Sequence, residues 1–131
     1  MAKFLNAVQD GSVPTVYGDG NQRRCFTYID DFIDGLVTAS ERPLGENETY
    51  NLGGTQEIEI SRLAELALDI GGRGDESPSF VDPTEIHGPD YDEPVRRVPD
   101  ISRAGDRLGW QPTVTLEEGL RRTYESMTSQ N

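Results

Sequence analysis

The order of hydrophobic and polar residues along the chain predicts short strands interleaved with helices. In the clearest helix, which begins at Ser61, apolar residues recur from Leu63 to Ile70 at the spacing of one helical face. Gly71 follows at the position where a left-handed cap is expected. Another helix is predicted after Asp30, which suits an N-cap. Its apolar stripe consists of Phe32, Ile33, Leu36 and Val37. The helix is expected to end at Pro43 and Gly45.

Three further helices are predicted near the two ends of the chain. Residues 3–9 form the tail of one, which stops at Asp10 and Gly11. Ser102 caps a short helix that ends at Gly109, and Trp110 is expected to pack back onto it. The last helix begins at a capping box, with Thr at residue 115 and Glu at residue 118. Its buried stripe is expected to consist of Leu116, Leu120, Tyr124 and Met127.

Strands are predicted over residues 14–17, 25–29, 48–52 and 57–60. Residues 73–94 contain four prolines, many acidic side chains and little periodicity, and only residues 79–81 suit a strand. We therefore predict a long, mobile loop at 73–94. Short strands between helices predict an α/β chain, of the α+β kind found in small substrate-binding domains, forming one domain over residues 1–131.

Composition narrows the classes of function. The chain has 131 residues, with 24 acidic and 12 basic side chains and a net charge of −12. Nucleic acid and anionic membranes are not expected as partners, because phosphate neutralisation needs clustered Lys and Arg. No apolar run approaches the roughly 20 residues of a spanning helix, and no signal-peptide pattern is visible, so a cytoplasmic location is expected. Cys25 is the single cysteine and one His is present, which excludes a disulfide framework and a zinc site of the usual ligands.

The basic residues are unusual, because Lys3 is the only lysine and the others are arginines. An acidic, lysine-poor chain is typical of a halophilic cytoplasm, since carboxylates keep a surface hydrated and salt screens their repulsion. A mildly acidic protein from a high-GC genome is the alternative.

Paired arginines are the first candidates for chemistry. Arg23 and Arg24 follow a Gly-Asp-Gly turn, and Arg96 and Arg97 follow the long loop. Guanidinium groups bind phosphate oxygens in pairs, although a solvated pair that balances Asp19, Asp30 and Asp31 would look the same. The pair at 121–122 is expected on the polar face of the last helix, so adjacent arginines are not diagnostic by themselves.

Other motifs are weaker. Asn51, before Gly53 and Gly54, could present its amide to a ligand or cap a turn. His87 and Tyr91 in the long loop could touch a substrate, and the paired carboxylates suit a hydrated surface better than acid–base catalysis. Neither 18–20 nor 72–74 continues with the glycine spacing of a dinucleotide fingerprint, and no phosphate-binding P-loop is present.

Taken in order, PTVYGDGNQRRCFTYIDDFIDGLV, TYNLGG, ISRLAELALDIGG and DEPVRRVPDISRAGDRLGWQPTVTLEEGLRRT cover nearly the whole chain. This succession resembles the C-terminal, substrate-binding part of NAD-dependent nucleotide-sugar epimerases and dehydratases, the extended short-chain dehydrogenase/reductases. The resemblance implies a domain that holds the nucleotide diphosphate of a UDP- or dTDP-sugar. It implies that Val16 and Tyr17 line the base pocket. It further implies that Arg24 contacts the diphosphate, that Arg97 clamps it from the other side, and that Asn51 is a further substrate contact. Arg23 and Arg96 match less regular positions.

The chain also departs from that family. The Gly-x-x-Gly-x-x-Gly cofactor motif is absent, and the Tyr-x-x-x-Lys couple is impossible because Lys3 is the only lysine. We therefore expect no catalytic residue and no bound cofactor here. The N-terminal NAD-binding Rossmann domain is expected to be missing, and NAD to belong to the full-length enzyme.

Two functions follow. In the first, the chain is the sugar-nucleotide-binding part of an epimerase or dehydratase that oxidises the sugar transiently, and it is inactive alone. It would self-associate through the apolar face that the missing domain leaves bare. In the second, it is a stand-alone, non-catalytic acidic interaction module.

Overall fold

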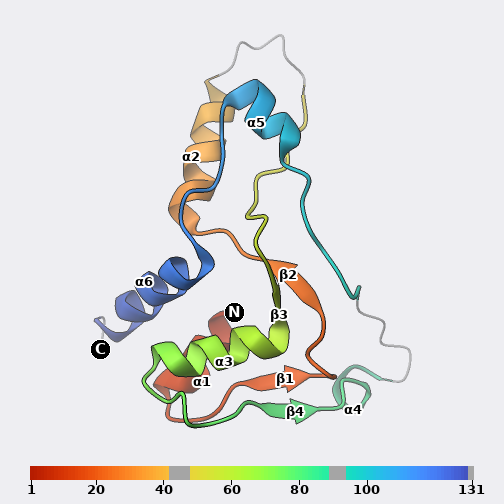
Figure 1. Ribbon diagram of the computed structural model, residues 1–131, viewed down its shortest axis with the longest axis vertical. Coiled ribbons are helices and arrows are strands. Elements are labelled where there is room, and N and C mark those ends of the chain that lie inside the picture. Colours follow the sequence, from red (N-terminus) through yellow and green to blue (C-terminus); the bar gives the residue numbers. More distant parts are fainter. Residues whose placement is uncertain (42–47, 89–93, 130–131) are drawn as a thin grey trace. The chain divides into compact units, whose positions relative to one another are not determined.

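The computed structural model describes residues 1–41, 48–88 and 94–129 (Figure 1). The expected helix end at Pro43 and Gly45, and the loop residue Tyr91, lie outside the described residues. The elements, in chain order, are α1 (Ala2–Gln9), β1 (Thr15–Tyr17), β2 (Arg23–Cys25), α2 (Ile29–Ser40), β3 (Glu57–Glu59), α3 (Ile60–Ile70), β4 (Ser79–Val81), α4 (Thr84–His87), α5 (Ser102–Leu108) and α6 (Leu116–Thr128). Short strands lie between helices along the chain, which confirms the α/β prediction.

The chain divides into two compact units. Unit 1 contains residues 1–24, 58–97 and 120–131, and unit 2 contains residues 25–57 and 98–119. Each unit is therefore built from segments that are distant in the sequence. None of the helices described in either unit has the length and apolar character needed to cross a membrane.

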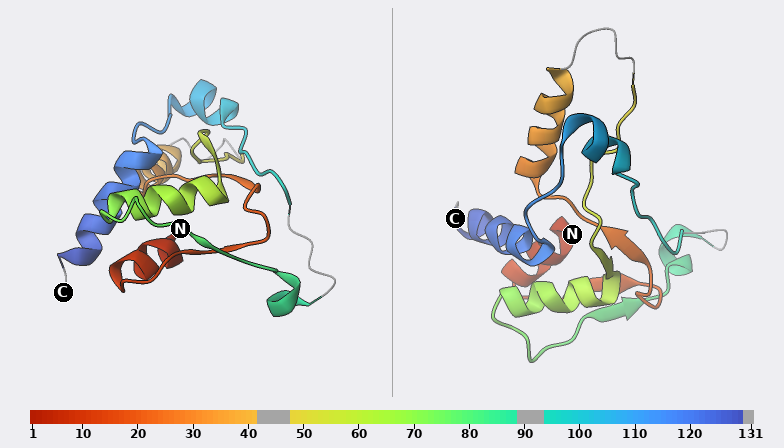
Figure 2. Two further views of the ribbon diagram at one scale, coloured as in Figure 1. Left: turned by 60° about the horizontal axis from the view of Figure 1, so that its bottom comes forward. Right: turned by 45° about the horizontal axis from the view of Figure 1, so that its top comes forward.

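Unit 1 is built on a parallel strand pair. β1 pairs with β4 in the register Thr15–Ser79, Val16–Phe80 and Tyr17–Val81. α3 packs on α1 and on β1, as both views in Figure 2 show. Fully buried side chains from the three elements, among them Leu5, Val16 and Leu63, form the core. The expected strands at 14–17 and 79–81 are thus confirmed to within one residue.

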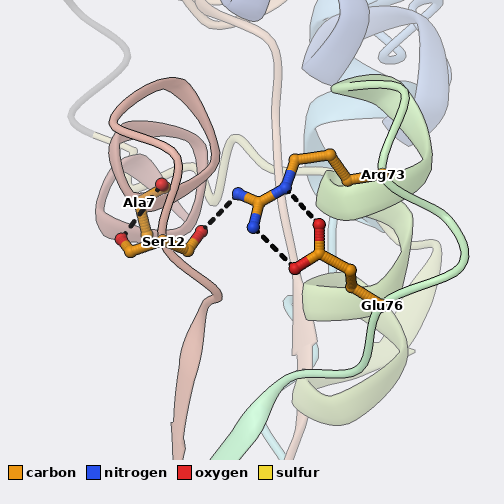
Figure 3. Close-up of polar contacts among 4 residues, drawn as sticks. All are labelled: Ala7, Ser12, Arg73 and Glu76. Atoms are coloured by element: carbon orange, nitrogen blue, oxygen red, sulfur yellow. Dashed lines mark hydrogen bonds and ion pairs between the residues drawn. The ribbon is translucent and has the colours of Figure 1, made fainter.

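An arginine clamp fastens the end of α3 to the turn after α1. Arg73 Nε and Nη2 lie 2.6 and 2.7 Å from the two carboxylate oxygens of Glu76, and Arg73 Nη1 donates to the Ser12 carbonyl at 2.7 Å (Figure 3). Ser12 Oγ in turn donates to the carbonyl of Ala7 at 3.1 Å. The bidentate pair lowers the pKa of Glu76. One guanidinium group therefore links two backbone segments of unit 1, the turn after α1 and the residues after α3.

Unit 2 is organised by one buried acid and the single tryptophan. Asp31, in the first turn of α2, accepts hydrogen bonds from the Thr113 N–H, the Val114 N–H and the Thr113 hydroxyl at 2.9–3.0 Å. Trp110 is 3% exposed and donates its indole N–H to the Asp31 carbonyl at 2.9 Å. It packs with Ala104 and Leu108 of α5, so the prediction that Trp110 folds back on this helix is confirmed.

The predicted stripe of α2 does not face the core. Its four residues are 37–49% exposed, whereas Asp31 and Gly35 are buried. A Cβ at Gly35 would lie 2.9 Å from the Trp110 ring, so a residue without a side chain allows the indole to approach the helix. The buried face of α2 was therefore misassigned, because long-range contact with Trp110 overrides the local pattern.

Several predicted boundaries are wrong in detail. The strand expected at 25–29 lies at Arg23–Cys25, and the N-cap of α2 is Tyr28 rather than Asp30. The strand expected at 48–52 is absent from the described residues, where that stretch has no ladder partner. Gly71 has φ −78°, and the positive φ falls one residue later, at Gly72.

The chain's last helices agree better with expectation. Gly109 ends α5 in the left-handed conformation, with φ 68°. At the start of α5, however, Asp100 Oδ1 accepts the Ser102 N–H at 2.9 Å, so Asp100 supplies the contact expected of Ser102. Thr115 Oγ1 accepts the Glu118 N–H at 3.3 Å, as a capping box requires, and Leu116 and Leu120 are buried. The short helix α4 was not expected within the segment predicted to be a loop.

Candidate functional site

The four arginines of the two predicted pairs meet in unit 1. Arg23 and Arg96 form a parallel β-bridge, in which the Arg23 N–H donates to the Val95 carbonyl at 2.7 Å. The Arg97 N–H donates to the Arg23 carbonyl at 3.1 Å. The end of the long loop is thereby held against β2 by backbone hydrogen bonds, and the second arginine pair lies beside the first.

The Arg23 carbonyl oxygen is shared. Besides the Arg97 N–H, it accepts a hydrogen bond from Nη1 of Arg24 at 2.9 Å. The Arg24 guanidinium and the Arg97 backbone are therefore within hydrogen-bond distance of one atom. Arg97 is exposed, and among the described residues no ion pair or side-chain hydrogen bond engages its guanidinium.

The geometry of β2 separates Arg23 from Arg24. Side chains alternate between the two faces of a strand, so within β2 Arg24 falls on the face opposite to Arg23. On its own face, Arg23 is balanced by Glu59 of β3, with Nη2 2.7 Å from Oε1. The arginine that matches the family motif is thus distinguished from its neighbour by the strand geometry.

The nearby acids that could have balanced these arginines are engaged elsewhere. Asp19 accepts the N–H and the amide Nδ2 of Asn21 at 3.0 and 2.8 Å, and these bonds lower the pKa of Asp19. Asp31 holds the 113–114 backbone in unit 2. The alternative, in which the first pair balances Asp19, Asp30 and Asp31, stays a prediction, and the acid seen to pair with Arg23 is Glu59.

A cavity of about 430 Å³ lies beside Tyr17 in unit 1. Its lining comes from α1, β1, the turn after α1 and the start of α3, and includes Phe4, Thr15, Tyr17, Gln22 and Ile60. Its volume falls within the range of small-molecule sites. Val16 is not part of the lining, because its side chain is completely buried in the core.

Gln22 is a residue of this cavity that the sequence did not single out. Its amide Nε2 donates to the Tyr17 carbonyl at 3.3 Å, while Oε1 is buried and has no hydrogen-bond partner among the described residues. Its place in the Gln-Arg-Arg-Cys-Phe motif, two residues before Arg24, was the available signal.

Asn51 belongs to unit 2. Its amide Nδ2 donates to the Asp100 carbonyl at 3.0 Å, and this bond joins the segment before Gly53 to the start of α5. The residue is exposed. The third arginine pair, at 121–122, is exposed on α6, as expected.

The glycines that could cradle a dinucleotide serve packing instead. A Cβ at Gly20 would lie 2.8 Å from the side chain of Ser61, and one at Gly54 would overlap the Phe26 carbonyl oxygen. The 18–20 turn leads from β1 into β2, not into a helix N-terminus. The turn at 18–20 therefore does not fit a pyrophosphate-binding loop.

Comparison with known proteins gives a consistent result. The family model described as GDP-mannose 4,6 dehydratase matches residues 1–123. The chain is 38% identical over 123 residues to UDP-glucuronic acid decarboxylase 1 of Xenopus tropicalis, covering 94% of this chain and 27% of that protein. It is 32% identical to UDP-glucose 4-epimerase of Mycolicibacterium smegmatis, covering 95% of this chain and 37% of that protein.

Solved structures show the same likeness. The structure of UDP-glucose 4-epimerase from Thermotoga maritima with UDP-glucose superposes with a TM-score of 0.82 at 28% identity, covering 97% of this chain and 38% of that one. UDP-glucuronic acid 4-epimerase from Bacillus cereus, in complex with UDP-glucuronic acid and NAD, gives a TM-score of 0.78 at 31% identity, covering 98% and 39%. The chain thus spans about a quarter to two fifths of the length of these proteins.

Proposed function

Because this chain belongs to the family of NAD-dependent nucleotide-sugar epimerases and dehydratases, we propose that it binds the nucleotide diphosphate of a UDP- or dTDP-sugar. The relatives named above act on UDP-sugars, and one of the solved structures contains UDP-glucuronic acid. In this proposal, unit 1 carries the base and diphosphate contacts.

The observation that carries the proposal is the meeting of Arg24 and Arg97 at the Arg23 carbonyl. The chain has a net charge of −12, so two arginines brought together by backbone pairing indicate a binding site for an anion. Each charge-assisted contact from a guanidinium to a phosphate oxygen contributes about 1.5–3 kcal/mol. Arg24 and Arg97 would take the diphosphate, while Arg23 remains paired with Glu59.

The cavity beside Tyr17 is the proposed site of the base. Tyr17 and Phe4 supply aromatic surface, and Gln22 supplies an amide close to them. Val16 contributes through its backbone and by fixing β1, since its side chain is buried. A uracil or thymine ring fits comfortably into about 430 Å³.

The proposal assigns no catalytic step to this chain. In the family, NAD supplies transient oxidation of the sugar, and a Lys lowers the pKa of a Tyr that transfers the proton. Lys3 is the only lysine, and no Tyr precedes it at that spacing. The residues present bind and orient the nucleotide, and we propose that the NAD-binding part belongs to polypeptide outside this chain. Whether the outcome is epimerisation, dehydration or decarboxylation would be set there.

Titration of UDP into the chain, followed by two-dimensional NMR, tests the binding proposal. The dissociation constant is expected on the order of millimolar, or about −4 kcal/mol, because the chain holds only part of the ligand's contacts. Shifts should concentrate on residues 15–24 and 95–97. Arg24→Gln should abolish saturation, whereas Arg121→Gln, an identical change on the exposed face of α6, should leave it unchanged.

Equal loss in both variants would indicate attraction to net charge rather than a site, and would contradict the proposal. Shifts confined to unit 2 would also contradict it. Submicromolar affinity would refute the claim that the chain holds only part of the ligand's contacts.

A further inference from the structure

One ion pair of unit 1 lies directly beside the proposed anion site. Arg23 Nη2 is 2.7 Å from Oε1 of Glu59, although the two residues are 36 positions apart in the chain. Arg23 is the residue whose carbonyl accepts both the Arg24 guanidinium and the Arg97 N–H. The negative charge of Glu59 is therefore placed close to the two arginines to which the proposed function assigns the diphosphate.

Backbone hydrogen bonds keep Glu59 in this place. Glu59 ends β3, which pairs with β2, and it directly precedes α3. The Ile60 N–H donates to the Gln22 carbonyl and the Ser61 N–H to the Gly20 carbonyl, both at 3.0 Å. The side chain of Glu59 makes no capping hydrogen bond to α3. Its carboxylate is therefore held beside β2 without serving the helix that follows.

We propose that Glu59 determines which diphosphate the site prefers, an inference that rests on the proposed function. By neutralising Arg23, Glu59 leaves the site with one positive charge fewer. The diphosphate of a UDP-sugar is a diester with two negative charges, whereas UDP ends in a phosphate monoester and carries about three near pH 7.5. The pair formed by Arg24 and Arg97 suits the two charges of the diester. Glu59 thus favours the sugar nucleotide over free UDP.

An exposed ion pair is often without function. The side chains of Arg23 and Glu59 are 52% and 39% exposed, and ion pairs of this kind contribute little to stability. A structural role and a charge role nevertheless differ in their consequences. Glu59→Gln adds one positive charge beside the site and Arg23→Gln removes one, although each substitution breaks the same ion pair. The two variants should therefore change the preference between ligands in opposite directions.

The size of the effect follows from Coulomb's law. Arg23 and Arg24 are adjacent in β2 with side chains on opposite faces, so the Glu59 carboxylate would lie roughly 10 Å from a phosphate held by Arg24. At an effective dielectric constant of about 20 and in about 0.1 M salt, one unit of ligand charge at that distance changes the affinity about two- to threefold. In about 1 M salt the screening length falls to about 3 Å, and the effect should disappear.

NMR titrations of the whole chain with UDP and with UDP-glucose test this inference through the ratio of the two dissociation constants. At about pH 7.5 and in about 0.1 M KCl, Glu59→Gln should lower the ratio of the UDP constant to the UDP-glucose constant about two- to threefold. Arg23→Gln should raise the ratio by a similar factor, and the double variant should restore it to within about 1.5-fold. Glu65→Gln is the matched control, because Glu65 pairs with Arg62 on α3 at the same distance of 2.7 Å, and it should leave the ratio nearly unchanged.

A structural role for the pair would move the ratio in the same direction in both single variants, or not at all, and either result would overturn the inference. An equal change in the Glu65 variant would also overturn it, as would a change that persists in about 1 M KCl. If the unchanged chain bound neither nucleotide saturably, the proposed function itself would be refuted, and this inference with it.

Discussion

Asp31 offers the sharpest test of how unit 2 is held together. Its carboxylate is 7% exposed and accepts three hydrogen bonds from residues 113 and 114, which lie far along the chain. Asp31→Asn preserves the shape of the side chain, but it replaces one accepting oxygen with an amide that itself donates. With the amide oxygen at the Oδ2 position, both N–H groups keep their acceptor but lose its negative charge, and the Thr113 hydroxyl must accept from Nδ2, so its own proton loses its acceptor.

The magnitude follows from those contacts. Net contributions of hydrogen bonds to charged groups are about 1.5–3 kcal/mol, and a buried donor left unsatisfied costs about 1–3 kcal/mol. Because the three bonds share one side chain, their losses do not add fully. We expect Asp31→Asn to lower the free energy of unfolding of unit 2 by about 2–4 kcal/mol, a large part of the about 5–15 kcal/mol typical of a whole domain.

Urea unfolding monitored by Trp110 emission provides the assay, because the indole N–H donates to the Asp31 carbonyl and the chain has no other tryptophan. With a denaturant slope of about 1–2 kcal/mol/M, the midpoint should fall by roughly 1–4 M. Asp30→Asn is the matched control, since it makes the same change at an exposed residue of the same helical turn. Asp30→Asn removes only the favourable interaction of the charge with the helix dipole, and it should lower the free energy of unfolding by about 0.3–1 kcal/mol. Equal shifts in the two variants would refute the assignment of Asp31 as the tie between α2 and the 113–114 segment.

Two further features of the structure, the close packing at Gly54 and the ion pair of Glu76, can be tested by substitution. Gly54→Ala should destabilise the chain by about 1–3 kcal/mol, because a Cβ would overlap the Phe26 carbonyl oxygen, whereas Gly105→Ala inside α5 meets nothing closer than 3.9 Å and should stabilise by about 0.5–1 kcal/mol. Urea midpoints that move in the same direction for both would contradict this. The Arg73 clamp lowers the pKa of Glu76 below its ordinary 4.5, so its contribution is present above that pH and is lost as the pH falls through the lowered value. Glu76→Gln should therefore be less stable than the unchanged chain near pH 7, and the difference should shrink as the pH falls below 4.5; a difference in thermal midpoint that does not shrink would count against the clamp.

Features that depend on neighbouring residues could be predicted from the sequence. The last two helices, the helix end at Gly109 and the Thr115 capping box follow from spacing and cap chemistry within a few positions. The α/β class and the segments that match the family could also be predicted from the sequence, because each depends on the order of residues along the chain. Arg24 and Arg97 could be named as candidates because each stands in a motif.

Features that depend on long-range contacts required the tertiary structure. The apolar stripe of α2 suggested a core face, but the Trp110 ring occupies the other side of the helix, where only Gly35 leaves it room. Residues 48–52 have strand-like composition, yet a strand needs a ladder partner, and composition does not specify one. That Arg97 lies against the arginines of β2 was decided by a parallel bridge between distant segments. Periodicity records only what each residue prefers locally, whereas the side of an element that is buried is set by whichever surface packs against it.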